Sequence, residues 1–315
     1  MVANVLELMV SLVVLLVGGD QFVIGIARLA ASFRVRPVVV GVIIGGIGTS
    51  LPELIVAFVA STRGDVPLAM GNLVGSVIAN LALALAIAAL VAPVKVDSRT
   101  IRREAPLSVA CVLLFGVLAM DGLSRAEGIV LAVVLVAALA LLLANVRVGK
   151  GRDELAAEVV DFFDARRPHP TRNEVFRALV GTAGMVGGAE LLVRSASSLA
   201  ARWGLAEGFV GLTIVAVGTS APLIASSVQA ARRGDHDLVA GNVLGGNLFI
   251  ALAGGVIVAF VAATPAGRMG AASLWLMGGV TVVAWAFMAR RSVITRWEAA
   301  ILLLAYGAML PLLSH

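Results

Sequence analysis

The chain has 315 residues, of which 60% are hydrophobic and only 14% are charged, and its mean hydropathy is +1.02. Soluble domains average about half apolar and about a quarter charged residues, so this composition excludes an ordinary soluble protein and predicts an integral membrane protein. The net charge of +5 would suggest nucleic acid as the partner of a soluble protein. Here the basic residues stand between apolar runs, so we expect the lipid bilayer and no nucleic acid.

Ten apolar runs follow one another along the chain, and a helix needs about 20 apolar residues to cross the hydrocarbon of a bilayer. The runs cover roughly residues 4–30, 38–61, 67–92, 106–120, 126–145, 175–200, 208–230, 237–263, 271–289 and 297–313. The first run begins with Asn4 and Glu7 instead of basic residues, so we do not expect a cleaved signal peptide. The sequence therefore predicts an all-α membrane protein with ten transmembrane helices.

The second run contains the motif GTSLPE at residues 48–53. Pro52 removes a backbone hydrogen bond, which hydrocarbon tolerates only where the freed groups face protein or a water-filled cavity. We therefore expect this helix to be broken near the middle of the bilayer. Glu53 shares a helix face with Thr49, and a carboxylate inside the membrane is costly enough that it usually marks an ion pathway.

The third run adds a polar stripe, because Asn72, Ser76 and Asn80 recur every four residues. Hard cations bind to carboxylate, amide, hydroxyl and main-chain oxygens. The motif and the stripe together predict a cation site, in which Glu53 and Asn80 are the candidate metal ligands. All candidate ligands in this half are Thr49, Ser50, Glu53, Ser76 and Asn80.

Structural roles for several of these residues remain open. Serine and threonine hydroxyls in membrane helices often bond to a carbonyl of the preceding turn, and Gly71 and Gly75 can be explained by helix packing alone. Asn72 and Asn242 can brace the broken backbone of a neighbouring helix instead of touching an ion.

An internal repeat relates the two halves of the chain. A shift of 170 residues aligns 41–80 with 211–250 without a gap, 14 of these 40 positions are identical, and the same shift pairs Asp20 with Glu190. Five predicted helices separate each element from its copy, and an odd number reverses its direction through the membrane. We therefore predict a five-plus-five inverted repeat, as in many secondary transporters, with helices 2 and 7 broken at Pro52 and Pro222.

One long polar segment divides the halves. The predicted organisation is a first five-helix repeat at 1–146, a linker at 147–171 and a second five-helix repeat at 172–315. A short helix on the membrane surface and a solvated linker are both open for the segment. With ten crossings, 17 loop Lys and Arg residues fall on one side and 4 on the other. The basic loops and the linker are therefore expected in the cytoplasm, and both termini outside.

The two motif copies carry a family resemblance. GTSLPE followed by GNLVGSVIAN, and GLTIVAVGTSAP followed by GNVLGGNL, resemble the two alpha repeats of the calcium/cation antiporter superfamily, the sodium/calcium exchangers. The resemblance implies exchange of calcium for sodium, protons or potassium by alternating access, with no tightly bound cofactor and with ion sites between helices 2, 3, 7 and 8. The ligands that it implies are Thr49, Ser50, Glu53, Ser76, Asn80, Thr219 and Ser220.

The second copy departs from the family pattern at three positions. Leu223 replaces the second glutamate, Gly246 replaces the serine of the GSN motif, and Ile250 replaces the Asn or Asp that follows it. Asn247 keeps the last residue of that motif. It lies roughly 100° around the helix from Gly246, so we expect a supporting role and no restored ligand.

The sequence thus predicts a secondary cation antiporter centred on Glu53, with calcium binding weakened by Leu223. A pair of unit charges 4 Å apart is worth on the order of 4 kcal/mol at an effective dielectric constant of about 20, so a divalent ion would lose on the order of 8 kcal/mol. A monovalent-cation or proton-coupled carrier and a non-transporting structural or regulatory relative are the alternatives. Asp20 and Glu190 can serve as gates, be solvated, or supply the missing carboxylate.

An enzyme is not expected. The histidines are His169, His236 and His315, all in loops or at the end of the chain, so Ser50 and Ser220 have no base within the bilayer.

Overall fold

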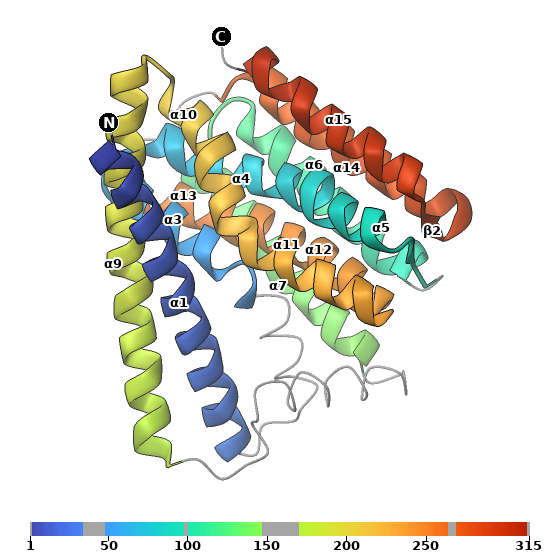
Figure 1. Ribbon diagram of the computed structural model, residues 1–315, viewed down its shortest axis with the longest axis horizontal. Coiled ribbons are helices and arrows are strands. Elements are labelled where there is room, and N and C mark those ends of the chain that lie inside the picture. The colour runs from blue at the N-terminus through green and yellow to red at the C-terminus, as the bar shows by residue number, and fades with distance from the viewer. Residues whose placement is uncertain (1, 34–47, 98–99, 147–169, 264–268, 314–315) are drawn as a thin grey trace.

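The computed structural model describes residues 2–33, 48–97, 100–146, 170–263 and 269–313 (Figure 1). The start of the aligned repeat, 41–47, and most of the predicted linker, 147–169, lie outside the described residues. The first half contains α1 (Val2–Ser32), α3 (Leu51–Thr62), α4 (Val66–Ala79), the π-helix η1 (Asn80–Leu85), α5 (Ala86–Val91), β1 (Val94–Lys95), the π-helix η2 (Thr100–Glu104), α6 (Ala105–Ala119) and α7 (Arg125–Val146).

The second half follows the same kind of order. It contains α9 (Thr171–Trp203), α10 (Glu207–Val210), the π-helix η3 (Gly211–Val215), α11 (Ala216–Arg233), α12 (His236–Phe249), the π-helix η4 (Ile250–Gly254), α13 (Gly255–Val261), α14 (Ala271–Arg291), β2 (Val293–Ile294) and α15 (Arg296–Leu313). The two short strands pair antiparallel, with Val94 opposite Ile294, and join the loops after α5 and α14.

Seven helices among the described residues are long and apolar enough to cross a membrane. They are Val5–Ala30, Val66–Val91, Arg125–Leu142, Thr171–Trp203, Glu207–Arg233, His236–Val261 and Ala271–Arg291. The protein is therefore a multi-pass helical membrane protein. In the 18-residue apolar window of the spans Val66–Val91 and His236–Val261, 78% and 72% of the residues are buried, the highest shares among the seven, so these two spans form the centre of the bundle.

Local structure recurs at the offset of 170 residues. The span Val66–Val91 becomes His236–Val261 on this shift, and the π-helix that begins at Asn80 has a counterpart that begins at Ile250. The turns before these spans also correspond, because Gly64 and Gly234 both have a positive φ, of 83° and 81°. Only glycine adopts this conformation readily, which explains why both copies keep it at the end of a helix.

The two proline positions differ. Pro52 lies in the first turn of α3, directly after a turn at Thr49 and Ser50, where a missing N–H leaves no helical bond unmade. Pro222 lies inside α11, which continues from Ala216 to Arg233. The predicted break of helix 7 at Pro222 is therefore wrong. The irregular backbone of this span lies earlier, in the π-helix η3, and the proline is accommodated within the helix.

The long helices α1 and α9 run antiparallel, side by side, at one edge of the bundle (Figure 1). Glycines make this close approach possible. A Cβ atom on Gly18 would collide with the backbone at Met185, and one on Gly188 would collide with the backbone of Leu15. An ion pair between Arg28 of α1 and Glu174 of α9, 3.4 Å apart, joins the two helices near the other end. The two helices therefore form one tightly packed pair.

The central helices also approach through glycines. A Cβ atom on Gly71 or Gly75 of α4 would collide with the backbone near Gly208 and Leu212, respectively. Both glycines therefore allow α4 to lie directly against α10 and η3. This packing brings the polar stripe of α4 to the start of α11.

Candidate functional site

Glu53 lies in the interior of the bundle, in the first turn of α3, with 1% of its surface exposed. Its Oε1 atom accepts a hydrogen bond from the Ser220 hydroxyl of α11, at 3.3 Å. Its Oε2 atom is buried and has no hydrogen-bond partner. Burying a carboxylate oxygen without a partner is costly, so this atom needs a proton or a cation beside it.

Two more buried oxygens without partners come from the polar stripe that runs along α4 to the first residue of η1. They are Oγ of Ser76 and Oδ1 of Asn80, and both residues are almost completely buried. Together with Oε2 of Glu53 they give one carboxylate, one hydroxyl and one amide oxygen. These are ligand types that hard cations use.

Asn80 is held by a residue from the other half of the chain. Its Nδ2 atom donates to Oδ1 of Asn247 on α12 at 2.8 Å, and Nδ2 of Asn247 donates to the carbonyl of Val77 at 3.2 Å. These bonds leave Oδ1 of Asn80 as the free acceptor. Asn247 therefore reaches the site through Asn80, although it does not occupy the position of the missing ligand.

Asn72 braces the backbone next to the carboxylate. It donates from Nδ2 to the main-chain carbonyl of Glu53 at 3.1 Å and accepts a bond from the Thr219 hydroxyl at 3.4 Å. The Thr219 hydroxyl is also within donating distance, 3.1 Å, of the main-chain carbonyl of Ala216. Asn242, the counterpart of Asn72 at the offset of 170, is half-buried and makes no hydrogen bond to a described residue. Bracing by asparagine is thus present in the first half.

Ser50 closes the other side of the cluster. The Ser50 hydroxyl donates a hydrogen bond to the main-chain carbonyl of Gly246 on α12, at 3.4 Å. A Cβ atom added to Gly246 would lie 3.2 Å from the same hydroxyl. Thr49 is half-buried in the turn before α3. The structure therefore brings predicted residues of α3, α4, α11 and α12 to one buried place, and the bond from Asn80 to Asn247 is a contact that the sequence alone did not predict.

The second half supplies no carboxylate to this cluster among the described residues. Leu223 is 2% exposed and Ile250 is fully buried, and both carry apolar side chains. Glu190 instead forms an ion pair with Arg63, which follows the last turn of α3. Arg63 is ten residues beyond Glu53, or about 15 Å along a helix. Glu190 is therefore engaged far from the cluster, and Asp20 is exposed on α1.

Apolar helices thus surround a buried group of unpartnered oxygens of the types that bind hard cations. The family profile described as "Sodium/calcium exchanger protein" matches residues 4–144 and 174–314. The chain belongs to the sodium/calcium exchanger family. The predicted resemblance is thus confirmed, and the family is one of antiporters, which are transporters and not enzymes.

Relatives cover most of the chain. It is 34% identical to inner membrane protein YrbG of Escherichia coli (strain K12) over 247 residues, 77% of this chain and 75% of the relative. It is 28% identical to the sodium/calcium exchanger MaX1 of Methanosarcina acetivorans over 345 aligned positions, 99% of each. A solved structure of the sodium-calcium exchanger NCX_Mj, soaked with Na⁺ and Sr²⁺, is 26% identical over 98% of each chain, with a TM-score of 0.66.

Proposed function

We propose that this protein is a secondary active cation antiporter that works by alternating access at a site centred on Glu53. The observation that carries this proposal is the buried Oε2 atom of Glu53, which has no partner and stands with two further unpartnered oxygens of Ser76 and Asn80. The ion-binding set is Glu53, Thr49, Ser50, Ser76, Asn80, Thr219 and Ser220, and the supporting residues are Asn72, Asn247 and Pro52. The transported cations are Na⁺, H⁺ or Ca²⁺, and no cofactor is tightly bound.

The architecture that we propose is ten transmembrane helices in a five-plus-five inverted repeat. The repeats are residues 1–146 and 172–315, joined by the linker 147–171. Two separate matches to the family profile and the recurring turns at Gly64 and Gly234 support this organisation. The excess of Lys and Arg in alternate loops favours a cytoplasmic linker and basic loops, with both termini outside.

Calcium binding is weakened because Leu223 stands where the repeat would place a second carboxylate. A divalent ion that loses one carboxylate contact loses on the order of 8 kcal/mol at an effective dielectric constant of about 20. Even half of that loss weakens binding by roughly a thousandfold. Calcium beside one carboxylate also leaves a net positive charge inside the membrane, whereas a singly charged ion leaves the site neutral. This balance favours, as second candidate, a monovalent-cation or proton-coupled carrier on the same site.

Flux measurements in vesicles test the proposal. The purified full chain is reconstituted, and isotope uptake of Na⁺ and Ca²⁺ and internal pH are followed under imposed sodium and proton gradients. We expect a sodium or proton flux that Glu53→Gln abolishes, with little sodium-driven calcium uptake. The Glu53→Gln side chain has nearly the same volume and can still accept from Ser220, so a correctly inserted variant isolates the charge. Flux that does not depend on Glu53, or no flux from a folded protein, would refute transport at this site.

A further inference from the structure

A cluster of charges joins the helix pair α1–α9 to the central bundle. The guanidinium of Arg63, after the last turn of α3, bonds to Oε1 of Glu190 on α9. The same carboxylate oxygen accepts from Nη2 and Nε of Arg194 at 2.8 and 3.2 Å. Nε of Arg63 also lies 3.9 Å from Asp65. Arg63 and Glu190 therefore connect the bundle to a helix of the outer pair.

The internal repeat contains the parts of a second connection of this kind. At the offset of 170 residues, Arg63 corresponds to Arg233, Asp65 to Asp235, and Glu190 to Asp20. The arginines follow or end the equivalent helices α3 and α11, and the carboxylates lie on the two members of the outer pair. The charges are kept here, although the repeat does not keep the carboxylate of Glu53.

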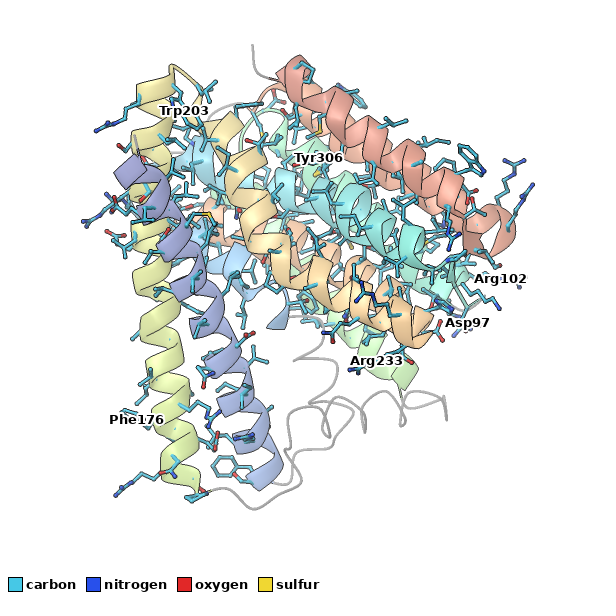
Figure 2. All side chains as sticks on the ribbon, in the orientation of Figure 1. Asp97, Arg102, Phe176, Trp203, Arg233 and Tyr306 are labelled. Carbon is cyan, nitrogen blue, oxygen red and sulfur yellow. The ribbon has the colours of Figure 1, made fainter. Side chains whose placement is uncertain are left out.

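The second connection is open in the structure. Asp20 and Arg233 are both exposed, and neither forms an ion pair or hydrogen bond with a described residue. Figure 2 shows Arg233 at the end of α11 that points away from α1 and α9. An exposed, unpaired carboxylate within a long apolar helix is costly in a membrane, which indicates that Asp20 has a partner in another state.

The geometry of the outer pair separates the two carboxylates along its axis. Because Gly188 packs on Leu15, Glu190 is about level with Val13 of α1. Asp20 is seven residues further along α1, or roughly 10 Å at 1.5 Å per residue. The pair thus presents Glu190 toward one end of the bundle and Asp20 toward the other.

We infer that Arg63–Glu190 and Arg233–Asp20 are two latches that close in turn, the first in the state described by the structure and the second in the state that opens to the opposite side. The two halves of an inverted repeat are equivalent in opposite orientations, so an arrangement that pairs residues 63 and 190 has an equivalent, facing the other side, that pairs residues 233 and 20. The inference rests on the proposed inverted repeat, and it does not depend on which cation is carried.

Cross-linking in the full-length protein in vesicles tests the latches. In a Cys111→Ala background, one variant carries Arg63→Cys with Glu190→Cys and a second carries Asp20→Cys with Arg233→Cys. A bifunctional thiol reagent about as long as an Arg–Glu pair is added, and intramolecular products are identified by peptide mass spectrometry. We expect both variants to cross-link. In the molecule that carries all four cysteines, we expect either link but never both.

A matched control and a charge variant sharpen the result. Asp20→Cys with Arg232→Cys places the second thiol on a neighbouring but differently directed residue, and we expect a much lower yield. In the variant that carries Asp20→Cys with Arg233→Cys, the added change Arg63→Gln opens the first latch and should raise the yield of the 20–233 product by up to about fivefold, as expected for a partly exposed ion pair. Arg63→Lys should leave the 20–233 yield nearly unchanged.

Two results would overturn the latches. The first is a 20–233 yield no higher than that of the 20–232 control while the 63–190 pair reacts. The second is both links in one molecule. Because the readout is a covalent product, it is separate from the ion fluxes that test the proposed function.

Discussion

Replacing Leu223 by glutamate should convert the site into one that holds calcium strongly. Leu223 occupies the repeat position of Glu53, is 2% exposed and lies in the first turns of α11, three residues after the Ser220 that bonds to Glu53. The Leu223→Glu change therefore adds a carboxylate to the second half without displacing a hydrogen-bonded side chain.

The magnitude follows from the charge added. One more unit charge about 4 Å from a divalent ion contributes on the order of 8 kcal/mol at an effective dielectric constant of about 20. Burial of the new carboxylate and its repulsion from Glu53 offset part of this gain. If half remains, calcium binds roughly a thousandfold more tightly than to the unaltered protein.

Calcium titration by calorimetry of the purified protein, together with sodium-driven calcium uptake in vesicles, measures the change. Leu223→Gln is the matched control, because glutamine has nearly the volume and polarity of glutamate but carries no charge. This variant should bind calcium no better than the unaltered chain. Size-exclusion chromatography confirms that each variant is folded. Tight calcium binding by the unaltered protein, or an equal gain in the Leu223→Gln variant, would refute the reasoning.

Two further predictions concern the hydrogen bond that holds Asn80 and the packing of α9 against α1. Asn247→Ala removes the acceptor for the Asn80 amide, so we expect the free energy of unfolding to fall by about 1–3 kcal/mol, the cost of an unsatisfied buried donor. Asn242→Ala should have little effect, because Asn242 makes no hydrogen bond to a described residue, and equal losses in thermal unfolding would contradict this difference. Gly188→Ala should lower the free energy of unfolding by about 1–3 kcal/mol, because the added methyl group collides with the backbone of Leu15. Gly187→Ala, where the added methyl group meets open space, should be neutral or stabilising. Thermal unfolding in detergent measures both variants, and equal midpoints would contradict the packing.

Local patterns in the sequence predicted much of the fold. The spacing of Asn72, Ser76 and Asn80 placed three polar side chains on one face of a helix, and all three are buried in the structure. The repeated glycine turns and the matching central spans were predictable because glycine, proline and charged residues at a fixed offset have few explanations other than a structural repeat.

Other features depend on contacts between distant residues and could not be predicted in this way. The bond between Asn80 and Asn247 joins residues 167 positions apart, and the spacing of residues within one helix does not identify a partner on a distant helix. The prediction of a broken helix at Pro222 failed because a helix can accommodate one lost hydrogen bond. The sequence also left the role of Glu190 open, since its partner Arg63 belongs to another helix.

The identity of the cation beside Glu53 is the most direct test of the central claim. Crystals of the full chain are soaked separately with Tl⁺, as an electron-dense monovalent ion, and with Sr²⁺, as a stand-in for calcium, and anomalous scattering locates each ion. The single-carboxylate site predicts Tl⁺ near Glu53, Ser76 and Asn80 and no ordered Sr²⁺ there. Strontium bound by Glu53 together with oxygen ligands from both halves of the chain would contradict it.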